Sequence, residues 1–89
     1  MNTDPIPVWK FFEIPPNSIE ICLKLAKIQS DNSKTQLHWL RAAEFLEKVK
    51  LQTTNQLSER DFDWMLKLRV LFEKDETVLK VKSDMNLEL

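Results

Sequence analysis

The chain has 89 residues, of which 13 are Lys or Arg and 14 are Asp or Glu, so its formal net charge is -1. This length allows one domain, and the charge excludes a strongly basic nucleic-acid binder, although a local basic patch is compatible with it. Glycine is absent, which excludes Gly-rich phosphate loops and Asn-Gly hairpin turns. A single cysteine excludes an internal disulfide. The single cysteine, together with the absence of a signal-peptide or transmembrane pattern, predicts a cytoplasmic protein.

Residues 1–16 are predicted to form an N-terminal arm. All four prolines lie here, and proline favours an extended residue before it. Between the prolines, residues 8–14 carry five large apolar side chains and fit either a strand or a helix of one and a half turns. We favour an arm whose aromatics cover the helical core. The alternative is a docking segment that inserts Trp9 and Phe12 into a partner, because aromatic side chains dominate binding hot spots.

A first helix is predicted over residues 18–29, with Asn17 or Ser18 as its cap. Apolar residues cover well over half of its circumference, which is typical of a helix that is covered on two sides. Cys22 lies within this apolar arc. We expect a buried, unreactive thiol, because no neighbouring His or Arg in the sequence would stabilise a thiolate.

A second helix is predicted over residues 34–52, where Ser33 and Gln36 match the capping-box pattern. Its apolar residues fall within an arc of about 120°, which predicts an amphipathic helix packed on one side. The members of this stripe are Trp39, Ala42, Ala43, Leu46 and Val49.

A third helix is predicted over residues 59–74, with Ser58 as its cap and acidic residues in its first turns. Its larger apolar group consists of Trp64, Met65, Leu68, Leu71 and Phe72. A second apolar band, made of Phe62, Leu66 and Val70, is separated from the first group on both sides. Either the first helix and the arm cover this band, or it contacts a second copy or a partner, because large uncovered apolar patches are uncommon on monomers.

Residues 77–82 are β-branched and loosely alternating, which favours a short strand. Such a strand would pair with residues 8–14 as a two-stranded ribbon. The same residues equally fit a continuation of the third helix past a kink at Asp75. Residues 83–89 are predicted to be a frayed tail.

The fold prediction is therefore a mainly α protein in which residues 17–82 form a single three-helix domain, preceded by an extended, aromatic-rich N-terminal arm and followed by the tail. The predicted core includes residues from all three helices: Leu23, Trp39, Leu46, Trp64, Leu68 and Leu71.

No catalytic constellation is recognisable. His38 and Cys22 lie on different predicted helices, and structural zinc usually requires four Cys or His ligands. Asp61 and Asp63 are two residues apart, so on a helix they point away from each other. We therefore expect no enzyme activity, no cofactor and no metal.

The predicted function is a small protein–protein interaction module, such as an adaptor, accessory subunit or inhibitor, whose partner is another protein or a second copy. The predicted contact residues are Trp9, Phe11, Phe12, Phe62, Leu66 and Val70. The alternative is a small nucleic-acid-binding regulator of transcription or RNA that uses lysines of the first two helices. These lysines are Lys24, Lys27, Lys34, Lys48 and Lys50. No membrane partner is expected.

Overall fold

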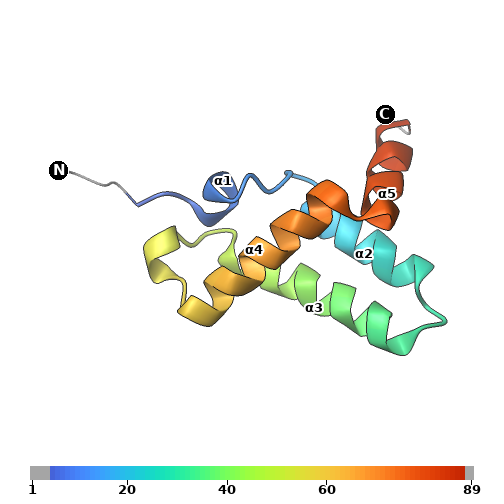
Figure 1. Ribbon diagram of the computed structural model, residues 1–89, viewed down its shortest axis with the longest axis horizontal. Coiled ribbons are helices and arrows are strands. Elements are labelled where there is room, and N and C mark those ends of the chain that lie inside the picture. Colours follow the sequence, from blue (N-terminus) through green and yellow to red (C-terminus); the bar gives the residue numbers. More distant parts are fainter. Residues whose placement is uncertain (1–4, 88–89) are drawn as a thin grey trace.

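The computed structural model describes residues 5–87, with side chains as far as residue 85, and this part of the chain is built from helices and short connections (Figure 1). The elements are α1 (Val8–Phe11), α2 (Ser18–Ile28), α3 (Ser33–Val49), the 3-10 turn η1 (Thr54–Gln56), α4 (Glu59–Lys74) and α5 (Glu76–Leu87). The mainly α prediction is confirmed, but the predicted number of three helices was wrong, because α1 and α5 are helical as well. The three long predicted helices correspond to α2, α3 and α4, and the largest difference in bounds is at the end of α3.

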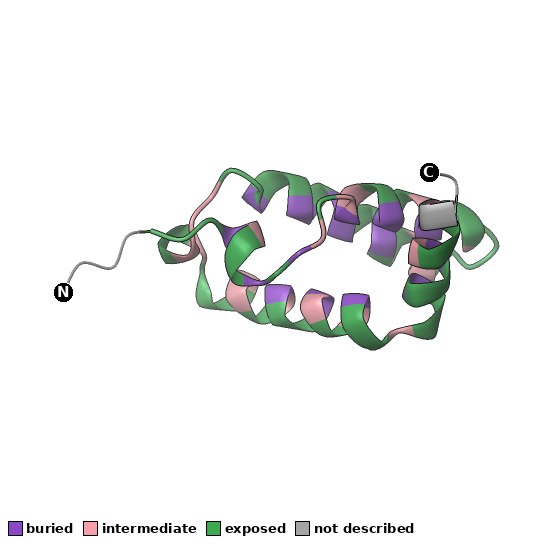
Figure 2. Ribbon diagram, turned by 90° about the horizontal axis from the view of Figure 1, so that it is seen from above, coloured by how far each residue is buried: buried purple, intermediate pink, exposed green. Residues whose placement is uncertain are grey.

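The helices enclose one apolar core. α2 and α3 lie side by side as an antiparallel pair and make the most extensive helix contact, while α5 packs on both α2 and α4. The Gln36 side-chain amide donates to the Ala26 carbonyl at 3.1 Å and ties α2 to α3. Figure 2 shows the buried residues on the facing sides of the helices and the exposed ones outside. Leu46 of α3 and Met65 and Leu68 of α4 are fully buried in this core.

The core prediction is correct for Trp39, Leu46 and Leu68, which are buried. Trp64 and Leu71 are partly buried and pack against the core. Leu23 is 48% exposed, so its assignment to the core was wrong. The reason is helical geometry, because Leu23 lies two residues from both Ile21 and Leu25, which place the buried side of α2 opposite to it.

Of the predicted helix caps, the one at α4 is confirmed and the one at α3 was wrong. Ser58 caps α4 as predicted, since its hydroxyl accepts from the Asp61 backbone N–H at 3.1 Å. At α3 the cap is Asn32, whose Oδ1 accepts from the Thr35 N–H at 3.3 Å, and the predicted Ser33–Gln36 box was wrong. The Gln36 side chain is instead bonded to α2, so a tertiary contact displaced the local one.

The prediction of an extended arm was also wrong. Of the two alternatives for residues 8–14, the helix is observed, as the single turn α1. Val8 and Phe12 are fully buried, and the Trp9 indole N–H donates to the Leu46 carbonyl at 3.1 Å. The residues before α1 pair with the chain after α3, through an isolated bridge between Pro7 and Thr53. These contacts fix α1 against one end of the core.

The predicted ribbon does not form, because residues 77–82 belong to α5. Asp75 interrupts the helix with ψ 122°, and its carboxylate accepts from the Thr77 and Val78 N–H groups at 2.9 and 3.2 Å. Val78 and Val81, three residues apart, are buried against the core. The predicted frayed tail was wrong as far as residue 87, where α5 ends, and residues 88–89 lie outside the described range.

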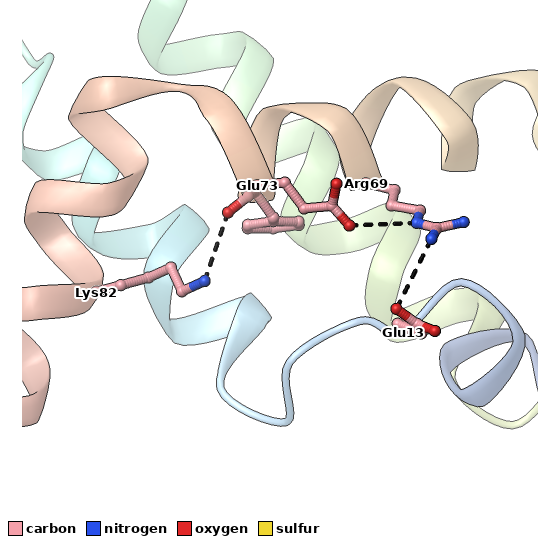
Figure 3. A network of polar contacts seen from close by, with 5 residues as sticks. Glu13, Arg69, Glu73 and Lys82 are labelled. Carbon is pink, nitrogen blue, oxygen red and sulfur yellow. Dashed lines mark hydrogen bonds and ion pairs between the residues drawn. The ribbon is translucent and has the colours of Figure 1, made fainter.

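Glu13 ends α1 in a left-handed conformation, with φ 54°. The Ile14 N–H bonds to the Trp9 carbonyl at 2.9 Å and the Glu13 N–H to the Lys10 carbonyl at 3.2 Å, which is the Schellman pattern. This position usually holds glycine, and the chain has none. The Glu13 carboxylate lies 3.7 Å from Arg69 of α4, which also pairs with Glu73 at 3.4 Å (Figure 3).

We predict that Glu13→Gly raises the free energy of unfolding by about 0.5–1 kcal/mol, because glycine adopts this conformation without the Cβ clash. The lost ion pair is exposed and contributes little. Urea unfolding of wild type, Glu13→Gly and Glu13→Ala tests this prediction. The alanine variant loses the same ion pair and keeps the Cβ atom, so it should be no more stable than wild type. Equal stability of the glycine and alanine variants would contradict the prediction.

Candidate functional site

The structure places the predicted contact residues of the arm in three different environments. Phe12 is fully buried and therefore inaccessible to a partner. Trp9 is partly buried and bonded to α3. Phe11 is 44% exposed, with its ring centroid 4.9 Å from that of Phe12. Of these three residues, Phe12 and Trp9 cover the core, and Phe11 is the one that presents a substantial apolar surface outward.

The second apolar band of α4 is covered by α1 at one end. The Phe62 ring is partly buried, with its centroid 5.0 Å from that of Phe12 and 6.0 Å from that of Phe11. One and two turns further on, Leu66 is 41% and Val70 51% exposed. The band therefore packs against the core at its first residue and is exposed apolar surface at the other two.

This surface continues into a shallow apolar groove beside α4. The groove has a volume of about 460 Å³ and is lined by His38, Trp64, Leu66, Lys67, Val70 and Leu71. The Trp64 ring stacks on Phe45 of α3, with centroids 4.3 Å apart and an interplanar angle of 18°. This stacking holds the indole in place at the groove wall. We call Leu66, Val70 and this groove the α4 outer face.

Charged residues of opposite sign stand at the two ends of this face. Glu59, Asp63, Leu66, Val70 and Lys74 are spaced by four, three, four and four residues, so they form one stripe along α4. All five are exposed. The stripe runs from acidic through apolar to basic. Beside it, the Asp63 carboxylate pairs with the amine of the neighbouring Lys67 at 3.4 Å.

A second groove, between α3 and α4, has a basic lining and a volume of about 590 Å³. It is lined by Lys34, Leu37, His38, Arg41, Arg60, Asp63, Trp64 and Lys67. Four basic side chains and one acidic side chain thus face a common space. Each helix supplies two basic residues seven positions apart, which places both on one side of the helix.

The lysines of the nucleic-acid alternative are not brought together in this groove, which Lys34 alone of them lines. Lys50 lies over the Trp9 ring, with its amine 5.2 Å from the ring centroid. Sequence reasoning missed Arg41, Arg60 and Lys67 as a basic set. The seven-residue spacing on two helices was the available signal, but it became meaningful only when α3 and α4 were placed next to each other.

Cys22 is buried and His38 is exposed, so the two side chains lie in different environments. Burial raises the pKa of the Cys22 thiol to about 12, so the thiol stays protonated and unreactive at neutral pH. His38 is exposed and borders both grooves. Within residues 5–87, no three His, Cys, Asp or Glu side chains are grouped so that they could hold a metal ion. None of the helices in this range is both long and apolar enough to cross a membrane.

Comparisons of the chain with protein-family models, with curated proteins and with solved structures give no match. The fold and the surface together define a small all-α domain with an apolar face and a basic groove that meet on α4.

Proposed function

We propose that the protein is a non-enzymatic protein–protein interaction module that associates through the α4 outer face, and that the partner is a second copy of the chain. The observation that supports this most strongly is the stripe on α4. Leu66 and Val70 lie exposed at its middle, with acidic residues before them and Lys74 after them. A two-fold contact brings such a surface against itself, so each half must complement the other.

An antiparallel pairing of two α4 helices satisfies this requirement. With the two-fold axis near position 68, Leu66 of one copy lies opposite Val70 of the other. Asp63 is about 7.5 Å before the axis and Lys74 about 9 Å after it, at 1.5 Å per residue. Each Asp63 therefore comes opposite the Lys74 of the second copy, and the helix dipoles are opposed as well.

The contact must extend beyond the stripe, because stable interfaces bury about 1,200–2,000 Å² in total. The groove adds apolar area from Trp64 and Leu71 on one side. On the other side, the exposed ring of Phe11 lies next to Phe62. Phe11 is thus the residue of the arm that we propose to take part in the contact, together with the outward parts of Phe62.

We predict that Leu66→Glu weakens self-association at least about tenfold, because a carboxylate without a partner in an apolar contact costs more than about 1.4 kcal/mol. Leu66 is exposed in the single chain, so the helical content should not change. Light scattering over a concentration series, with far-UV circular dichroism, measures both quantities. Leu79→Glu on α5 is the matched control, since Leu79 is 42% exposed and lies outside the α4 outer face.

The antiparallel arrangement has its own test within this experiment. Asp63→Lys and Lys74→Asp should each weaken association by about three- to tenfold, because two exposed pairs are lost and replaced by repulsion. The double variant restores the pairs and should recover the wild-type association. A wild-type protein that stays monomeric at millimolar concentration, or equal effects of Leu66→Glu and Leu79→Glu, would refute self-association through this face.

We also propose a cytoplasmic location. Cys22 is the single cysteine and is a free, buried thiol, which suits a reducing compartment.

A further inference from the structure

The groove between α3 and α4 concentrates positive charge in a chain whose net charge is -1. Lys34 and Arg41 approach it from α3, and Arg60 and Lys67 from α4. Asp63 is the one acidic side chain in the lining and pairs with Lys67 at 3.4 Å. Lys34, Arg41 and Arg60 therefore provide positive charge that the acidic lining does not offset. Such a space attracts an anion with more than one negative charge.

The same groove also has an aromatic wall. Trp64 lines it, and the stacking of Trp64 on Phe45 at 4.3 Å holds the indole in position from the core side. Leu37 adds apolar surface from α3. Aromatic side chains beside a basic surface bind nucleobases by stacking, whereas the basic groups contact phosphates.

We propose that this groove binds a nucleoside phosphate, either as a free nucleotide or within a single-stranded nucleic acid. The phosphates would contact Arg41 and Arg60, whose guanidinium groups bind phosphate oxygens in pairs, with Lys34 adding charge. The base would pack against Trp64. The volume of about 590 Å³ lies within the range of small-ligand sites. The two grooves share His38, Trp64 and Lys67, but the proposed phosphate contacts come from Lys34, Arg41 and Arg60, which do not line the apolar groove. The proposal therefore does not depend on self-association.

The experiment titrates the full chain with three probes: adenosine triphosphate, inorganic triphosphate and a short oligothymidylate. Calorimetry gives the affinities, and the NMR signal of the Trp64 indole N–H, assigned with Trp64→Phe, reports on the base. We expect this indole signal to shift with either nucleotide probe and inorganic triphosphate to bind more weakly. Tighter binding of the oligonucleotide than of adenosine triphosphate would assign a single strand as the source, and the reverse order a free nucleotide.

Charge-reversal variants inside and outside the groove distinguish binding in this groove from a general effect of net charge. Arg41→Glu and Arg60→Glu should each weaken nucleotide binding at least about tenfold, because each removes a phosphate contact and adds repulsion. Lys48→Glu makes the same change in charge at an exposed position of α3 that does not line the groove, and should have less than about a twofold effect. For the oligonucleotide, about three phosphate contacts predict a slope near -2 in a plot of log affinity against log salt.

Several results would overturn the proposal. These are no binding of any probe at millimolar concentration, equal losses in Arg41→Glu and Lys48→Glu, or an affinity for inorganic triphosphate equal to that for adenosine triphosphate. Circular dichroism of each variant verifies its fold. If one arginine variant fails to fold, Arg41→Gln and Arg60→Gln remove the charge without reversing it and should still weaken binding.

Discussion

Phe12→Ala is expected to lower the free energy of unfolding by about 3–5 kcal/mol, the usual cost of removing a fully buried aromatic ring. Phe12 is completely buried in the apolar core. Its ring meets those of Phe11 and Phe62 edge to face, with centroids 4.9 and 5.0 Å away. The alanine variant loses these contacts and leaves a cavity between α1 and α4 that the fixed helices cannot close completely.

Chemical denaturation followed by circular dichroism measures this loss, with Phe11→Ala as the matched control. Phe11 is the neighbouring residue and is 44% exposed, so removal of the same ring should cost much less. The comparison also tests whether the arm is part of the core. Equal, small losses in both variants would mean that α1 does not pack on the domain in solution.

Leu46→Ala is the second large expected effect, a loss of about 2–5 kcal/mol. Leu46 is completely buried on α3, and its backbone carbonyl accepts the hydrogen bond from the Trp9 indole. The substitution removes apolar volume at the point where Trp9 of α1 contacts α3. Both the core and the packing of the arm on α3 are therefore affected.

Leu40→Ala provides the control on the same helix, because Leu40 is exposed and the substitution removes the same side-chain atoms. Its expected cost is below about 1 kcal/mol, as for most exposed substitutions. Thermal unfolding of both variants gives the comparison. If Leu46→Ala cost less than about half a kilocalorie per mole, Leu46 would have to lie outside the core.

The sequence alone determined the three long helices and the buried side of α3. Apolar residues spaced by three and four specify α3 and α4 without reference to any neighbour, and Ser58 marks the start of α4 by a bond within its own first turn. The same periodicity separated Leu66 and Val70 from the core side of α4, and both are exposed. Local patterns were sufficient because these helices are long enough for the period to be unambiguous.

The shorter segments were decided by tertiary contacts. Residues 77–82 combine β-branched residues with a spacing that also suits a helix, and burial of Val78 and Val81 on the core, after the Asp75 cap, selects the helix. The arm is helical because the Phe12 ring packs on Phe62 of α4 and the Trp9 indole donates to the Leu46 carbonyl of α3. Neither partner can be read from the arm itself.

The candidate sites divide in the same way. The apolar band was visible from the spacing on one helix, whereas the basic groove joins Lys34 and Arg41 to Arg60 and Lys67 across two helices. Periodicity states which side of each helix carries a residue type, but it does not state which helices become neighbours. That choice follows from how the apolar sides are buried together, so the groove between α3 and α4 exists only in the tertiary structure.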